Sequence, residues 1–196
     1  MTVIILGGFL GSGKTTVLME LVPYLTKQTT GFEHPVVVLE NEIALSDVDS
    51  KMLQSRGMEV RTLTAGCICC TASGALEDSV RTIREQFAPA YLVIEATGMA
   101  YPDAIAQAVR DAGEDDVRIL VLADAKRWKK LKLAMPKFVE SQLCHASVVF
   151  LNKIDLVEKS AWDDAIKDIE MAAPTVQLFL LSAINGIDES CFYSLQ

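Results

Sequence analysis

A glycine-rich stretch early in the sequence has the residue types and spacing of a phosphate-binding loop (P-loop). The pattern G-x-x-x-x-G-K-[ST] directly follows the apolar run 3–6 and is matched by Gly8, Gly13, Lys14 and Thr15. Glycines let successive backbone N–H groups point inward toward an anion, and the following helix adds the positive potential of its N-terminus. Lys14 is expected to reach the outer phosphates of a nucleotide, and the Thr15 hydroxyl to bind Mg²⁺. The other residues expected to line this phosphate site are Gly11, Ser12 and Thr16.

A second motif follows a later apolar run and indicates the base. Its residues are Asn152-Lys153-Ile154-Asp155. A carboxylate such as Asp155 accepts two hydrogen bonds side by side, and guanine offers two donors, N1–H and N2–H, on one edge. Adenine would leave that desolvated carboxylate unpaired, which argues against an ATP-dependent small-molecule kinase. Ser182 and Ala183 arrive one strand later and are placed to support the same base through backbone N–H groups.

An acidic residue ends the apolar run 91–94. Glu95 is expected to lie beside the P-loop and to contact Mg²⁺ directly or through water, where an Asp is more usual. A solvated strand-end acid is the alternative, but four apolar residues in front of Glu95 argue against it. Gly98 is placed to donate a backbone N–H to the γ-phosphate.

A cysteine cluster stands apart from the nucleotide motifs. Cys67, Cys69 and Cys70 fall within four consecutive positions. Thiolates bind soft or borderline ions such as Zn²⁺, Cu⁺ or Co²⁺, and three of them leave a tetrahedral site incomplete. The fourth ligand would be a water, a thiolate of another chain or a carboxylate such as Glu42, and an incomplete site suits transfer better than storage. Buried small side chains or a redox pair are the alternatives.

The overall composition is that of a globular protein. The chain has 196 residues, 51% of them hydrophobic, which favours a single domain over 1–196. A formal net charge of −8 argues against a nucleic-acid partner. No apolar run approaches the length of a membrane span, and the first strand leaves no room for a signal peptide. The cytoplasm is therefore the expected location, and clustered cysteines in a reducing compartment favour a metal or redox site.

Apolar runs alternate with helical patterns along the chain. Strands are expected at 3–6, 36–39, 59–63, 91–94, 117–123, 147–151 and 176–181. Helices are expected at 14–27, 73–87, 102–111 and 161–171, with an amphipathic helix of solvated basic face at 126–132. This rhythm predicts an α/β fold of three layers, with a mostly parallel central sheet and helices on both faces. Ligands bind at the carboxyl edge of such sheets, where every motif above begins.

Taken together, the motifs resemble the metallochaperone GTPases of the CobW, UreG and HypB type, and the CobW-like branch most closely. The resemblance rests on the P-loop 7–16, Gly66-Cys67-Ile68-Cys69-Cys70-Thr71, Glu95-Ala96-Thr97-Gly98 followed by Pro102, and Asn152 to Asp155. It implies a P-loop NTPase fold and the binding of GTP and Mg²⁺. It also implies a transition metal, zinc or else cobalt or nickel, held at the Cys-x-Cys-Cys motif and delivered to a client metalloprotein or corrinoid protein. Slow GTP hydrolysis would act as a release switch, and homodimers are frequent in the family.

The sequence differs from the usual pattern of CobW-like proteins in two ways. CobW-like proteins usually carry a second, C-terminal domain and a histidine-rich stretch, whereas this sequence ends at Gln196 and has two histidines. The first switch usually reads N-E-F-G-E-x-G-x-D, and only Asn41, Glu42 and Asp49 match it. The resemblance makes Glu42 an accessory ligand of the transition metal and Asp49 a switch carboxylate near Mg²⁺ or the attacking water. The catalytic set is then Lys14, Thr15, Glu95 and Asp49.

A second hypothesis keeps the GTP switch but removes the metal cargo. The chain would activate or protect a cobalamin or corrinoid enzyme through protein contacts, with Cys67, Cys69 and Cys70 in a structural role. Replacing all three cysteines with serine distinguishes the two hypotheses.

Overall fold

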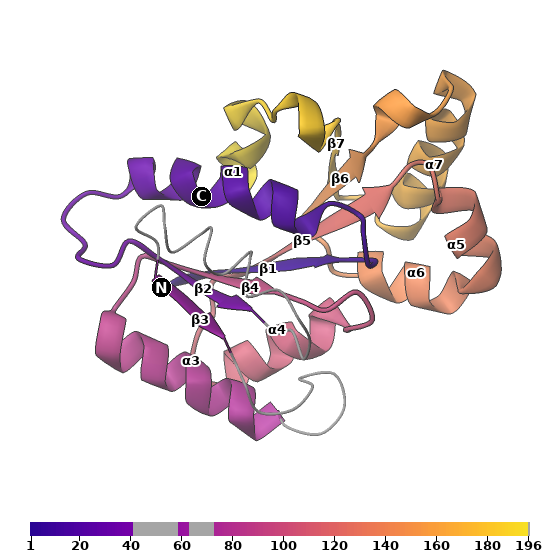
Figure 1. Ribbon diagram of the computed structural model, residues 1–196. Coiled ribbons are helices and arrows are strands. Elements are labelled where there is room, and N and C mark those ends of the chain that lie inside the picture. Colours follow the sequence, from indigo (N-terminus) through magenta and orange to yellow (C-terminus); the bar gives the residue numbers. More distant parts are fainter. Residues whose placement is uncertain (41–58, 63–72, 196) are drawn as a thin grey trace.

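A parallel sheet organises the computed structural model, which describes residues 1–40, 59–62 and 73–195. In this part of the chain the sheet has seven strands in the order β3-β2-β4-β1-β5-β6-β7, and all neighbouring pairs are parallel (Figure 1). The strands are β1 (Thr2–Gly8), β2 (Val36–Glu40), β3 (Glu59–Thr62), β4 (Tyr91–Glu95), β5 (Val117–Asp124), β6 (Val148–Asn152) and β7 (Gln177–Leu180). The predicted α/β fold is confirmed.

Helices connect the strands. They are α1 (Lys14–Gln28), α3 (Ser73–Phe87), α4 (Pro102–Asp111), α5 (Trp128–Ala134), α6 (Pro136–Leu143) and α7 (Lys159–Ala172). Short 3₁₀ helices follow β6 and β7, namely η1 (Ile154–Leu156), η2 (Ala183–Asn185) and η3 (Glu189–Leu195). Among the described residues, no helix is both long and apolar enough to span a membrane.

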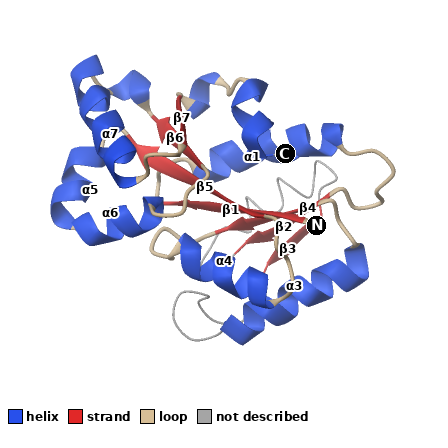
Figure 2. Ribbon diagram, turned by 180° about the vertical axis from the view of Figure 1, so that it is seen from behind, coloured by secondary structure: helices blue, strands red, loops and turns tan. Residues whose placement is uncertain are grey.

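The two faces of the sheet bury separate hydrophobic clusters. Because side chains alternate along a strand, Ile4 and Leu6 of β1 face α1 and η3, whereas Val3 and Ile5 face the cluster that includes α3 and α4. Figures 1 and 2 show α1 on one side of the sheet and α3 and α4 on the other. The result is the predicted three-layer arrangement.

Strand register brings the ends of four strands together. Leu6 of β1 pairs with Glu95 of β4, and Gly8 pairs with Leu122 of β5. Asp124, at the end of β5, pairs with Asn152 at the end of β6. The loops that follow β1, β4, β5 and β6 therefore start from one edge of the sheet, and the P-loop, Glu95 and Asn152 lie there.

Most predicted elements are confirmed within a residue or two, including α3 at its predicted bounds 73–87. Apart from the three-residue helices η1 and η2, two elements of the structure were not predicted. One is α6, which begins with Pro136 and packs Phe138, Val139 and Leu143 into the core. The other is η3, whose Phe192 and Leu195 pack against the α1 face. Both are short, so their apolar residues span too few turns to show a clear helical period.

Candidate functional site

The P-loop turns from β1 into α1 through positions that only glycine fits. Gly8 has φ 122°, and a Cβ there would overlap the carbonyl oxygen of Leu122. Gly13 has φ 107°, and a Cβ there would overlap the amide nitrogen of the Asn152 side chain. Gly13 is also the N-cap of α1, so the loop feeds directly into the helix N-terminus.

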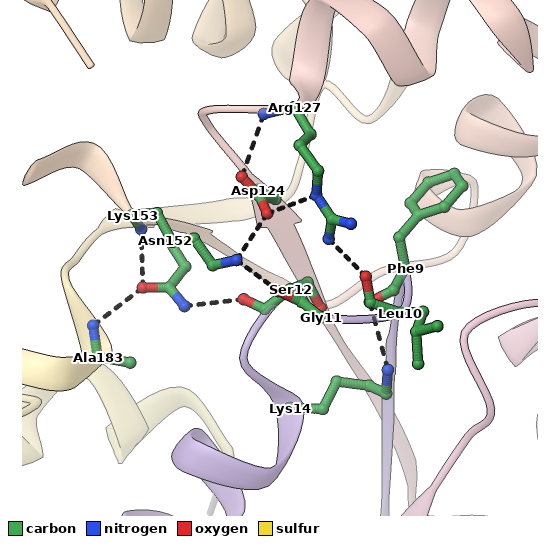
Figure 3. Close-up of polar contacts among 10 residues, drawn as sticks. All are labelled: Phe9, Leu10, Gly11, Ser12, Lys14, Asp124, Arg127, Asn152, Lys153 and Ala183. Carbon is green, nitrogen blue, oxygen red and sulfur yellow. Dashed lines mark hydrogen bonds and ion pairs between the residues drawn. The ribbon is translucent and has the colours of Figure 1, made fainter. Parts of the chain in front are cut away.

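Every carbonyl oxygen from residue 8 to residue 13 accepts a hydrogen bond from within the protein. The donors are, in order along the loop, Lys14 Nζ, Ser12 N–H, Arg127 Nη2, Lys153 Nζ, Asn152 Nδ2 and Val17 N–H. Figure 3 shows the side-chain donors gathered around the loop. The carbonyl oxygens, which are the negative ends of the peptide dipoles, thus face protein donors. This arrangement favours the binding of an anion by the backbone N–H groups of the loop.

Lys14 and Thr15 form the start of α1, directly after the glycine-rich loop. Lys14 is buried, and its Nζ donates to the carbonyl oxygens of Gly8 (3.1 Å) and Phe9 (3.4 Å). The Thr15 hydroxyl lies 3.5 Å from Oε1 of Glu95. The two residues expected to hold Mg²⁺ are therefore adjacent. A hydroxyl and a carboxylate are hard oxygen donors, so this pair fits that ion together with water and phosphate ligands. Thr16 is exposed beside them.

Asn152 ties the P-loop to the segment after β7. Its side chain is buried, and Nδ2 donates to the carbonyl oxygen of Ser12 (2.8 Å). Its Oδ1 accepts from the backbone N–H groups of Lys153 (2.8 Å) and Ala183 (2.9 Å) (Figure 3). Asp155 is exposed in η1. Asn152 therefore brings together two of the segments predicted to bind the base.

The structure adds Asp124, which the sequence motifs did not identify. Its carboxylate is 1% exposed, and Oδ2 accepts from Arg127 Nε and Lys153 Nζ, both at 2.8 Å. Burial on its own would raise the pKa of Asp124, but the hydrogen bonds and positive charges of Lys153 and Arg127 lower it below the usual value. The only sequence signal for Asp124 is an acid at the end of the apolar run 117–123, which is the same kind of signal that predicts a role for Glu95 after 91–94.

Arg127 corrects the predicted solvated basic face of 126–132. Lys129 and Lys130 are exposed as expected. The Arg127 guanidinium instead bridges Asp124 and the P-loop, donating to the carbonyl oxygen of Leu10. Helix α5 begins after it, at Trp128. Helical periodicity misplaced Arg127 because the residue precedes the helix and turns back toward β5 through its backbone bond to Asp124.

Gly98 packs directly on the P-loop. A Cβ at this position would overlap the backbone nitrogen of Leu10, so the segment after β4 approaches the loop more closely than any side chain would allow.

The remaining predicted site residues lie outside the described part of the chain. They are Glu42, Asp49, Cys67, Cys69 and Cys70. The described elements that flank the cysteines in sequence are β3, which ends at Thr62, and α3, which begins at Ser73. Within residues 1–40, 59–62 and 73–195, no group of three His, Cys, Asp or Glu side chains could hold a metal ion.

Residues 2–179 match the family model of the CobW/HypB/UreG nucleotide-binding domain. The chain belongs to this family. It is 38% identical over 202 residues to the zinc chaperone YjiA of Escherichia coli K12, covering 94% of this chain and 61% of YjiA. It is 30% identical over 171 residues to the zinc-regulated GTPase metalloprotein activator 1 of Schizosaccharomyces pombe, covering 81% of this chain and 40% of that protein. The chain thus spans less than two thirds of either relative.

A solved structure of a family member shows the same fold. The hydrogenase maturation factor HypB from Archaeoglobus fulgidus superposes with a TM-score of 0.70 at 16% identity, over 97% of this chain and 85% of HypB. At that identity the likeness extends to the fold alone.

Proposed function

We propose that this protein is a GTP-binding, slowly GTP-hydrolysing metallochaperone that carries a transition metal at Cys67, Cys69 and Cys70 and delivers it to a client metalloprotein. The proposal that the protein binds GTP rests on the P-loop, whose carbonyl oxygens all accept hydrogen bonds from protein donors. Thr15 and Glu95 lie next to each other at the end of this loop. The proposal that the protein carries a transition metal is supported by its family, which has members named zinc chaperones. Zinc is the proposed cargo, with cobalt or nickel as alternatives.

The nucleotide would bind along the carboxyl edge of the sheet. Backbone N–H groups of the P-loop and the Lys14 ammonium would bind the phosphates, and Gly98 would add an N–H toward the γ-phosphate. Thr15 and Glu95 would hold Mg²⁺, which when bound neutralises phosphate charge. Asp155 would accept the N1–H and N2–H of guanine, supported by the backbone around Ser182 and Ala183.

Hydrolysis converts GTP and water to GDP and phosphate, and we expect it to be slow. Lys14 would stabilise the charge that develops on the phosphate oxygens, and Asp49 is the proposed switch carboxylate near the water. A slow reaction suits a timer that separates a metal-holding state from a metal-releasing state. In this proposal residues 1–196 act as one domain in the cytoplasm, with a client and a second copy of the chain as partners rather than nucleic acid or a membrane.

Zinc titration in two nucleotide states tests the proposal. The protein is titrated with Zn²⁺ under reducing conditions, once with Mg²⁺ and a non-hydrolysable GTP analogue and once with GDP. We expect the zinc affinity to differ between the states, because contacts to the γ-phosphate would alter the metal site. The triple variant Cys67→Ser, Cys69→Ser, Cys70→Ser should lose zinc binding, since hydroxyls are poor ligands for this ion.

Cys144 supplies the control, because its side chain is exposed and the residue is far from the cysteine cluster in the sequence. Cys144→Ser should bind zinc like the wild type. Equal zinc affinities in both nucleotide states would refute the coupling. A client that the triple variant activates as well as the wild type would favour the regulatory role with structural cysteines.

A further inference from the structure

Helix α6 inserts a buried glutamine between two segments of the nucleotide site. Gln142 is 3% exposed. Its Oε1 accepts the backbone N–H of Gly8 (3.1 Å), and its Nε2 donates to the carbonyl oxygen of Ala100 (2.5 Å). Gly8 opens the P-loop, and Ala100 lies two residues after Gly98. One side chain therefore joins the P-loop to the segment that follows β4.

The chemistry of the two partners fixes the orientation of this amide. An N–H can only donate and a carbonyl can only accept, so the Gln142 oxygen must face Gly8 and the nitrogen must face Ala100. A flipped amide would set donor against donor and acceptor against acceptor. Because both atoms are buried, losing either contact leaves a polar group unsatisfied.

Phe138 repeats the same bridge one helical turn earlier, on the same face of α6. Its ring packs edge-on against Phe9 of the P-loop, with centroids 5.3 Å apart. It packs in the same way against Tyr101, at 5.1 Å. A polar bridge from Gly8 to Ala100 is thus followed by an aromatic bridge from Phe9 to Tyr101.

Tight backbone packing supports the coupling independently of α6. A Cβ on Gly7 would come within 2.7 Å of Cγ of Pro102. A Cβ on Gly98 would overlap the backbone nitrogen of Leu10. The segment 98–102 therefore lies against the loop 7–10 with no spare volume, so neither can shift by much unless the other follows.

We propose that Gln142 is a positioning residue that couples the P-loop to the segment from Glu95 to Pro102. Its two hydrogen bonds set the place of Glu95 and Gly98 relative to Lys14 and Thr15. Displacing Gly98 by about 1 Å would weaken contacts to the γ-phosphate, which only GTP carries, and leave the contacts to GDP nearly intact. The consequence for turnover rests on the proposed GTP hydrolysis, whereas the mechanical coupling does not.

Gln142→Met tests the proposal because it keeps the length of the side chain and removes both hydrogen bonds. We expect single-turnover GTP hydrolysis to fall tenfold or more, while the Kd for GDP changes by less than about threefold. Phe138→Leu removes both ring contacts but stays apolar. It should lower the rate of GTP hydrolysis by a smaller factor and likewise leave the Kd for GDP nearly unchanged. Glu140→Gln, on the exposed side of α6, is the matched control and should behave like the wild type.

Hydrogen exchange measured by mass spectrometry gives a readout that does not require turnover. In the wild type, adding GDP should slow exchange in both 8–16 and 96–102. In Gln142→Met the response of 8–16 should remain and that of 96–102 should be lost.

The outcomes separate the two proposals. A Gln142→Met variant that keeps both the wild-type rate and the exchange response overturns the coupling. Equal loss of GDP affinity and hydrolysis also overturns it, because that pattern marks a merely structural residue. A wild-type protein that fails to hydrolyse GTP refutes the proposed function, and the exchange response of 96–102 to GDP still decides the coupling.

Discussion

Asp124→Asn should destabilise the protein and weaken nucleotide binding together, because Asp124 holds the two cations that bind the P-loop. The substitution keeps the shape of the side chain but removes its charge and turns an NH₂ group toward a cation. Each charge-assisted hydrogen bond in a buried setting contributes about 1.5–3 kcal/mol. Two such bonds reach Asp124, but the side chains of Arg127 and Lys153 remain 41% and 29% exposed. Solvent recovers part of the loss, so we expect a decrease of about 2 kcal/mol in the free energy of unfolding.

Thermal unfolding at pH 7 should then show a Tm lower by about 4–8 °C for a chain of this size. Isothermal titration should show a Kd for GDP raised about tenfold, equivalent to ~1.4 kcal/mol, because the carbonyls of Leu10 and Gly11 lose the anchoring of their donors. The matched control is Asp168→Asn. Asp168 also pairs with a lysine and an N–H donor, Lys132 and Trp128, but it joins α7 to α5 away from the P-loop. That variant should lose stability and keep the wild-type affinity for GDP.

The pH dependence of the stability difference provides the sharpest check. Because the folded-state pKa of Asp124 lies below the unfolded value of about 3.9, its contribution is complete above that pH. It is lost as the pH falls through the folded-state pKa. The difference between the wild type and Asp124→Asn should therefore be constant from pH 7 to 5 and shrink below about pH 4. Other acids titrate in both proteins and cancel in the difference. A difference that persists unchanged to pH 3, or is absent at pH 7, refutes the assignment.

Two further substitutions test the base and the loop. Asp155→Asn should lower the affinity for GDP about a hundredfold and favour the xanthine nucleotide, because the C2 carbonyl of xanthine can accept a hydrogen bond from the new NH₂ group. Calorimetric titration with both nucleoside diphosphates measures this change. If the variant binds GDP as tightly as the wild type, the base binds elsewhere. Gly13→Ala should destabilise by about 3 kcal/mol, because it adds a clash with Asn152 to the backbone strain at φ 107°. The control is Gly31→Ala, where φ is 86° and a Cβ would meet no atom within 4 Å. Its free energy of unfolding, measured in urea, should fall by only about 1 kcal/mol.

The sequence was most informative where function depends on short-range pattern. Glycine spacing, a lysine and a hydroxyl residue define a P-loop within ten residues, and apolar runs placed Glu95 and Asn152 at strand ends. The roles of Asp124, Arg127 and Gln142 depend on contacts between residues far apart in the chain, such as Gln142 with Gly8 across 134 positions. No local periodicity encodes such a contact. The sequence therefore predicts the loop, but not the side chains that hold it in place.

Those side chains change the energetic picture of the loop. A free glycine-rich loop would lose conformational entropy on binding an anion, at roughly 1–2 kcal/mol per residue fixed. Here the carbonyls of residues 8–13 are already bound by donors, three of which come from the ends of β5 and β6 or the turn after them. Much of that ordering has therefore taken place on folding. Under the proposed function, nucleotide exchange would depend less on reshaping the P-loop than on movement of the segment 95–102 beside it, to which the buried Gln142 side chain connects the loop.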